Sequence, residues 1–298
     1  MTTIVKDERT AVQSAPARAY WALTLGILSI GFSAIFVRWA DAPGAVTGFY
    51  RMLIAVIALA VPFIRYLGKA GYPPRREVLI ALAAGIFFGS DLIFWNTGIL
   101  ISGAANPTLM ANTAPVWVGL GAMLIFKEKL GVLFWTGLAI ALGGAALILG
   151  ADIRNSVGLG TLLGLIAGIF YAGYLLIMQR SRRALPALPA FWLACVGAMV
   201  MLFIVARLQG ESLTDYSLQT WLAFLAMGLI SQVLGQLLVS YALGALPASL
   251  VSPTLLGQPA LTMLLAIPLL GEIPTPWHVL GGAILLIGVY IVHRSRAA

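Results

Sequence analysis

Apolar residues form ten long runs along the chain, and the short stretches between them carry most of the charged side chains. A helix needs about 20 mostly apolar residues to cross the hydrocarbon core of a bilayer, and each run is close to that length. The pattern therefore predicts an all-α membrane protein with ten transmembrane helices. These helices are expected at residues 20–38, 44–66, 77–101, 103–126, 131–150, 158–178, 188–208, 218–242, 247–270 and 276–293.

Composition supports lipid as the main solvent. Of the 298 residues, 61% are hydrophobic and 9% are charged, whereas a soluble globular chain carries about 25% charged residues. The net charge of +8 does not indicate nucleic-acid binding, because the basic residues lie between apolar runs and form no continuous basic face. Residues 1–19 form a polar segment without a cleavage site after an apolar core, so we expect a cytoplasmic tail and not a removable signal peptide.

The positions of the basic residues predict the orientation of the chain in the membrane. With the N-terminus inside, the outer segments hold only Arg38, Arg154 and Arg207, whereas the inner segments hold 14 basic residues. Cytoplasmic segments carry an excess of Lys and Arg, so we expect both termini in the cytoplasm and a multi-pass protein of the bacterial inner membrane. The inner residues are Lys6, Arg9, Arg18, Arg65, Lys69, Arg75, Arg76, Lys127, Lys129, Arg180, Arg182, Arg183, Arg294 and Arg296.

The two halves of the chain, residues 20–150 and 158–293, resemble each other. Four residue pairs are each separated by 144 positions: Pro115 and Pro259, Glu128 and Glu272, Gly137 and Gly281, and Gly144 and Gly288. Each half contains five predicted spans, an odd number, so the second half must enter the membrane from the opposite face. This is an inverted repeat, which is typical of secondary transporters with a site where the halves meet.

Both halves interrupt their fourth span in a similar way, with "NPTLMANTAP" at 106–115 and "SPTLLGQP" at 252–259. Proline removes a helical hydrogen bond, and a buried amide is costly. Paired interruptions at corresponding positions indicate the binding region of a transporter. The predicted helix breaks are at Pro107, Pro115, Pro253 and Pro259.

The segment "LLGEIPTPWHVLGGAILLIGVYIV" resembles the end of the EamA-type repeat in the drug/metabolite transporter superfamily. The segments "WALTLGILSIGFSAIFVRW" and "VTGFYRMLIAVIALAVPFI" resemble its first two helices, although Lys127 stands where the pattern has glycine. Within the superfamily the chain is most similar to bacterial aromatic amino-acid exporters. The resemblance implies ten helices around a central cavity and export of amino acids or other metabolites by alternating access.

Arg51 and Asp91 are the only charged residues deep within predicted spans. Such charges are costly in a membrane and indicate a functional site by default. Their depths differ by roughly 5 Å, so two hypotheses remain. In the first, which we favour narrowly, they form a structural ion pair between two helices. In the second, they face the cavity and bind the two ends of a zwitterion, or Asp91 titrates during transport.

Uncharged polar and aromatic side chains complete the candidate substrate-binding site. Asn112 and Gln258 occupy corresponding positions beside the paired prolines, so we expect them to face each other across the site. The alternative role for these amides is interhelical hydrogen bonding, and Gly160, Gly164 and Gly168 are expected to pack helices closely. The other candidates are Tyr50, Trp95, Asn96, Trp117, Tyr171, Tyr174, Gln232, Gln236 and Tyr241.

Several function classes are disfavoured. No predicted span has a central His or Lys to activate a serine, so we do not expect an enzyme. Cys195 is the only cysteine, and His278 and His293 lie at opposite ends of one run, so no metal site or cofactor is predicted. A phosphate-bearing substrate would need more basic groups than Arg51 alone. Amino-acid export by a monomer leads, and export of lipophilic drugs or other small metabolites is the alternative.

Overall fold

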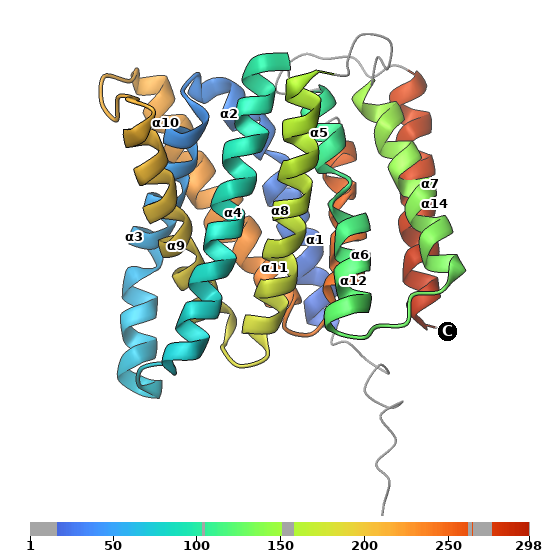
Figure 1. Cartoon of the computed structure of the whole chain (residues 1–298), viewed down its shortest axis with the longest axis horizontal. Helices are drawn as coiled ribbons and strands as arrows, with labels where there is room; N and C mark the ends of the chain where they lie inside the picture. Colours follow the sequence, from blue (N-terminus) through green and yellow to red (C-terminus); the bar gives the residue numbers. More distant parts are fainter. Residues whose placement is uncertain (1–16, 103–104, 151–157, 262–263, 265–275, 298) are drawn as a thin grey trace, which may run out of the picture.

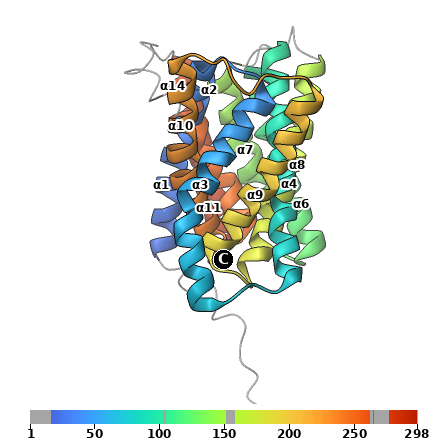
Figure 2. The ribbon, with the colours of Figure 1, turned by 90° about the vertical axis from the view of Figure 1, so that its left-hand side faces the viewer.

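The computed structural model describes residues 17–102, 105–150, 158–261, 264 and 276–297, and within these residues every regular element is a helix. The long helices run roughly parallel to one another in a single bundle (Figures 1 and 2). The helices of the first half are α1 (Ala17–Gly31), α2 (Ser33–Ala40), α3 (Gly44–Ala70), α4 (Arg75–Ser102), α5 (Ala105–Ala111), α6 (Ala114–Ile125) and α7 (Val132–Leu149). Those of the second half are α8 (Leu159–Arg182), α9 (Ala187–Leu208), α10 (Leu218–Ala226), the π-helix η3 (Met227–Gln236), α11 (Leu237–Ala242), α12 (Ala248–Leu255) and α14 (Pro276–Ala297).

Most of the predicted membrane runs are helical in the described chain. Eight helical stretches of the described chain are long and apolar enough to cross a membrane, and Val132–Ile148 is a shorter apolar helix. The predicted run 247–270 continues into residues outside the described ranges, and Glu272 also lies outside them. The described chain is therefore a multi-pass membrane protein.

Four of the predicted spans differ in detail from the helices. The first is broken at Phe32 between α1 and α2, and the second extends to Ala70 with Pro62 inside the helix. The fourth breaks after Ala111, so Pro115 lies in the first turn of α6, where a proline lacks no needed hydrogen bond. The eighth contains the π-helix η3, which the apolar pattern did not predict.

The helix formed by the second Pro-Thr-Leu motif is interrupted too. α12 ends at Leu255, and helix resumes over residues 257–261 after a turn at Leu256. Pro253 lies inside α12 and Pro107 inside α5, so the interruptions follow these prolines along the chain and do not coincide with them.

Glycines on α8 bring the interrupted fourth span close. A Cβ atom on Gly164 would lie 2.4 Å from the carbonyl oxygen of Pro107, and one on Gly168 would lie 2.9 Å from that of Ala111. Gly160 makes a similar approach to Ser102 at the end of α4. The predicted packing role of these three glycines is confirmed, and it fixes α5 against α8.

A second glycine-lined contact joins α7 to α14. A Cβ atom on Gly144 would lie 2.3 Å from the backbone nitrogen of Leu285, and one on Gly288 would lie 2.3 Å from that of Ala141. Gly137 and Gly281 make matching approaches from the two helices. These four glycines are two of the sequence-matched pairs, so equivalent helices of the halves meet through their equivalent residues. The α7–α14 pair lies at one edge of the bundle (right in Figure 1).

The remaining helices pack around a shared core. α4 packs against α8 and α9, and α3 packs against α9 and η3. α1 packs against η3 and α11. Helices of the first half are thus in contact with helices of the second half in much of the bundle.

Candidate substrate-binding site

Arg51 on α3 is held by polar side chains from two other parts of the chain. Its Nε donates a hydrogen bond of 2.7 Å to Oε1 of Gln232 on η3. Its Nη1 donates one of 3.1 Å to Oγ of Ser33, the first residue of α2 after the break at Phe32. The guanidinium carbon lies 5.7 Å from the ring centroid of Phe88 on α4, within cation–π range. Arg51 therefore connects both halves of the chain.

Arg51 and Asp91 do not form the ion pair that we favoured from the sequence. Both are buried, with 4% and 8% of their surface exposed. No ion pair joins them in the described structure, because two of the guanidinium nitrogens bond to Gln232 and Ser33. Two of the guanidinium nitrogens bond instead to an amide and a hydroxyl oxygen, partners that apolar patterns do not reveal.

Parts of both charged groups remain open. Neither Nη2 of Arg51 nor the carboxylate oxygens of Asp91 hydrogen-bond to a described residue, and none of these atoms is completely enclosed by protein. A charged group inside a membrane protein must meet an opposite charge, a polar partner or water. The open atoms are thus positioned to meet a polar ligand or water.

Aromatic rings lie beside these charges. Phe88 on α4 stacks on Tyr174 of α8, with ring centroids 4.6 Å apart. The ring centroids of Tyr171 and Tyr174 are 5.8 Å apart, and the side chain of Gln236 on η3 lies beside the Tyr171 hydroxyl. The hydroxyl of Tyr174 is buried and has no hydrogen-bond partner in the structure. The predicted residues Tyr171, Tyr174, Gln232 and Gln236 therefore gather around Arg51 and Asp91.

Other predicted site residues connect neighbouring helices. Asn96 donates to the carbonyl oxygen of Gly44 at 3.0 Å, and Nε1 of Trp95 donates to Oγ1 of Thr108 at 3.1 Å. Trp117, in contrast, bonds within its own helix: its Nε1 donates to Oγ1 of Thr113, the residue before α6, at 3.3 Å.

Asn112 lies at the break between α5 and α6, and its Nδ2 is buried without a partner in the structure. Gln258 lies partly exposed in the helical stretch after Leu256. No described contact joins the two amides, and their mutual approach remains a prediction.

Two candidates lie away from Arg51. Tyr50 donates to the carbonyl oxygen of Leu213 at 2.6 Å and stacks on Phe224, so it belongs to an aromatic cluster on α10. Tyr241 is 40% exposed on α11. For Tyr50, a neighbour in sequence of Arg51, the helical rotation of about 100° per residue explains the difference.

Sequence reasoning missed three members of the cluster. Phe88 is three residues before Asp91 and thus on the same face of α4, a spacing that was available as a signal. Ser33 had only a weak signal, because the break at Phe32 contains no proline and is marked only by Gly31, the last residue of α1. Cys195, which the sequence offered only as a lone cysteine, is buried and accepts a hydrogen bond from Nε2 of Gln232 at 3.6 Å.

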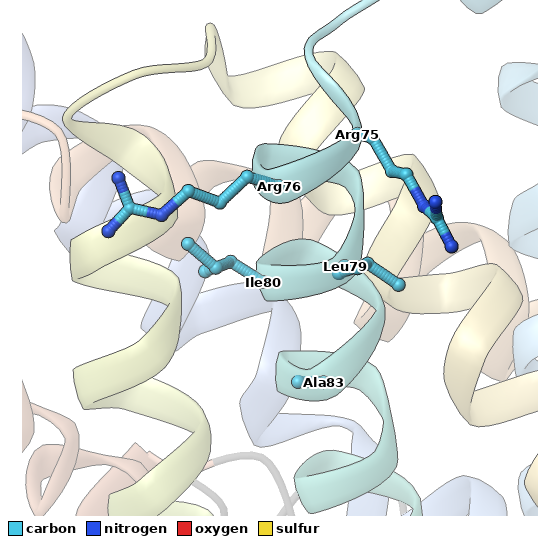
Figure 3. Close-up of a pocket in the computed structure, with 5 residues that line it drawn as sticks. All are labelled: Arg75, Arg76, Leu79, Ile80 and Ala83. Carbon is cyan, nitrogen blue, oxygen red and sulfur yellow. The ribbon is translucent and has the colours of Figure 1, made fainter.

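A separate surface depression of about 590 Å³ lies at the start of α4, lined by Arg75, Arg76, Leu79, Ile80 and Ala83. The side chains of Arg75 and Arg76 extend to opposite sides of the helix (Figure 3). At a rise of 1.5 Å per residue, Arg76 is about 22 Å from Asp91 along α4. This depression is therefore distinct from the polar cluster. Within the described residues there is no group of metal-ligating side chains.

Several known proteins resemble this chain over more than half of its length. It is 26% identical over 276 residues to the uncharacterised transporter YdfC of Bacillus subtilis (strain 168), covering 88% of this chain and 89% of that protein. It is 26% identical over 293 residues to a probable terminal-alkyne amino-acid exporter of Streptantibioticus cattleyicolor, covering 93% and 94%. It is also 27% identical over 187 residues to a riboflavin transporter of Rhizobium johnstonii, covering 59% and 60%.

A solved crystal structure with 18% sequence identity covers 93% of this chain and 97% of its own length, with a TM-score of 0.79, which shows a shared fold. The model of the EamA-like transporter family matches residues 17–150 and again residues 158–294. Two matches account for nearly the entire chain and agree with the two halves seen in the sequence. The chain belongs to the EamA-like transporter family and is a membrane transporter, not an enzyme.

Proposed function

We propose that this protein is a secondary transporter that exports amino acids, aromatic or other neutral ones, and related metabolites across the bacterial cytoplasmic membrane by alternating access. The observation that carries the proposal is the buried pair of opposite charges, Arg51 and Asp91, that do not neutralise each other by contact. A zwitterionic amino acid carries a carboxylate that complements Arg51 and an ammonium group that complements Asp91.

The chemistry of the cluster suits an α-amino acid. The open Nη2 of Arg51 is a donor for a carboxylate, and such charge-assisted hydrogen bonds are strong. The carboxylate of Asp91 is an acceptor for an ammonium group. The rings of Phe88, Tyr171 and Tyr174 provide apolar faces for an aromatic or long apolar side chain. One relative of this chain is named a probable amino-acid exporter, which supports the same substrate class.

The arrangement we propose is ten transmembrane helices in two inverted repeats, residues 20–150 and 158–293, with both termini in the cytoplasm. The contact between equivalent glycines of α7 and α14 supports it, because a two-fold relation brings equivalent residues together. The interruptions near Asn112 and near Leu256 lie at corresponding positions and support it too. One chain then supplies both halves of the site, so a monomer is sufficient.

Alternating access requires one end of the pathway to be closed, and contacts at one end support this. Oγ of Ser249 at the start of α12 donates to Oε2 of Glu128, which follows α6. The backbone N–H of Ala248 donates to Oε1 of Gln179 near the end of α8 at 2.8 Å. The guanidinium of Arg183 lies 4.6 Å from the ring centroid of Phe126. In the proposed orientation this is the cytoplasmic end, and these contacts support a state closed to the cytoplasm.

The alternative substrate class is a lipophilic drug or another small metabolite. The aromatic rings favour it, and one relative is named a riboflavin transporter. Such a substrate would use the rings but would not require both open charges.

Counterflow in proteoliposomes separates these proposals. Proteoliposomes that contain the purified protein are loaded with one unlabelled compound. The entry of labelled phenylalanine, other amino acids, riboflavin or a lipophilic dye is then measured. We expect counterflow with amino acids and loss of it in Arg51→Gln. Counterflow with dyes or riboflavin that persists in Arg51→Gln, without amino-acid counterflow, would replace the proposal by its alternative.

The interrupted helices provide a second test. Asn112→Leu and Gln258→Leu should each lose counterflow while folded yield is preserved, since both amides are expected to line the site. Wild-type transport by both variants would show that these amides only pack helices.

A further inference from the structure

Gln232 holds Arg51 in a defined orientation. A guanidinium has only donors, so the oxygen of the Gln232 amide must face it, as the 2.7 Å hydrogen bond shows. The amide nitrogen then faces the other way and donates to Sγ of Cys195 at 3.6 Å. Gln232 is completely buried on η3, so its side chain has little freedom to rotate.

This orientation divides the donors of Arg51 into two groups. Nε bonds to Gln232 and Nη1 bonds to Ser33, whereas Nη2 has no partner among the described residues. Gln232 and Ser33 are uncharged, so they fix the guanidinium without neutralising it. Its charge is therefore left for another partner, and the ring of Phe88 lies 5.7 Å from the guanidinium carbon.

We propose that Gln232 is a positioning and specificity-determining residue: it aims Arg51 at the substrate's carboxylate and, because it is neutral, keeps the site selective for zwitterionic amino acids over the amines that lack a carboxylate. This inference rests on the proposed function. It differs from a substrate contact, since Gln232 acts through Arg51.

The chemistry predicts what a charged residue at this position would do. In Gln232→Glu, the carboxylate takes the same place as the amide and forms a buried ion pair with Arg51. The guanidinium is then neutralised from inside, so a substrate's carboxylate gains little there, and the site keeps the negative charge of Asp91. An amine of the same side chain carries only the ammonium group and becomes the better substrate.

The experiment measures counterflow of phenylalanine and of 2-phenylethylamine, its decarboxylated counterpart, in proteoliposomes. We expect Gln232→Glu to lower the ratio of amino-acid to amine transport by at least about tenfold, through a higher KM for phenylalanine. Gln232→Met removes the acceptor without adding charge, so it should raise the KM for phenylalanine with no gain for the amine. Gln236→Glu is the matched control: it adds the same charge to η3 beside Tyr171, with no hydrogen bond to Arg51.

The outcomes separate this inference from the proposed function. If the wild type transports neither phenylalanine nor any other amino acid, the proposed function fails, whatever the variants do. If the wild type transports amino acids but Gln232→Glu loses both substrates in equal proportion, Gln232 is only a structural residue and the inference is overturned. A ratio shift of the same size in Gln236→Glu would also overturn it, because the effect would then be one of net charge and not of the orientation of Arg51.

Discussion

The Arg51 cluster and the α7–α14 pair join the two halves of the chain by opposite means. At the α7–α14 pair, backbone meets backbone across glycines, and a Cβ atom on Gly144 would lie 2.3 Å from its neighbour. At the Arg51 cluster, long polar side chains reach across, with Gln232 as the main partner. In a membrane the first contact gains van der Waals packing, whereas the second keeps a charge that only polar partners or a ligand can satisfy.

This difference indicates a division of labour. Where two backbones touch across glycines, no side chain is present that could exchange one partner for another. Such a contact suits a fixed attachment between helices. A cluster with open donors and acceptors has alternatives, because a ligand or water can replace a protein partner. We therefore expect substitutions at the α7–α14 pair to act on folding, and substitutions in the Arg51 cluster to act on transport as well.

The largest effect is expected from removing the charges. Arg51→Leu strips partners from Gln232 and Ser33, and each buried polar group left unpaired costs about 1–3 kcal/mol. Folded yield should fall and transport should be lost. Because Arg51 and Asp91 do not bond to each other, adding Asp91→Leu should not restore the yield.

The check is folded yield by size-exclusion chromatography for both single variants and the double variant. A structural ion pair, the hypothesis we favoured from the sequence, predicts the opposite result: the double variant would recover much of the yield, since no charge is stranded. Such a recovery would show that the two charges pair during folding or in another state.

A smaller effect is expected at the glycine contact. Gly144→Ala places a methyl group against the backbone of α14, and overpacking of this kind costs about 1–3 kcal/mol. Gly143→Ala is the matched control, because a Cβ atom there meets nothing within 4 Å. We expect Gly144→Ala to lower the melting temperature in detergent and Gly143→Ala to leave it unchanged. Amino-acid selectivity should be unchanged in both variants. Equal melting temperatures would mean that α7 and α14 move apart at little cost.

The same two regions show what sequence can and cannot predict. Gly144 and Gly288 were visible as a matched pair, and apolar run lengths located the membrane helices, because lipid imposes a simple pattern on helix length and polarity. The burial of Arg51 was expected for the same reason. Its partner was not, because Gln232 is 181 positions away and its reach depends on η3. A π-helix has no apolar signature, and the break at Phe32 that presents Ser33 has no proline and only Gly31 before it.

The smallest effects are expected at two threonines that the shared Pro-Thr-Leu motif places in the two regions. Oγ1 of Thr108 accepts a hydrogen bond from Trp95, on the same helix as Asp91. Oγ1 of Thr254 donates to the carbonyl oxygen of Leu250 and lies 2.8 Å from Nε2 of His293 on α14. A hydroxyl has one hydrogen, so His293 must be the donor in the second contact. Each threonine thus accepts from a ring N–H, one near the Arg51 cluster and one where α12 meets α14 of the α7–α14 pair.

Thr108→Val and Thr254→Val keep the shape of the side chain and remove the acceptor. Interhelical hydrogen bonds in membranes average about 0.6 kcal/mol, so each variant should lower the free energy of unfolding by about that amount. If the two regions differ as argued, Thr108→Val also raises the KM for amino acids. The variant leaves Trp95 without its hydrogen-bond acceptor, and Trp95 lies one helical turn after Asp91 on α4. Thr254→Val should leave KM unchanged, because it loosens only the attachment of α14. Unfolding in mixed detergents and counterflow measure the two quantities. A change of KM in Thr254→Val equal to that in Thr108→Val would contradict the division of labour, because α14 would then be coupled to the site.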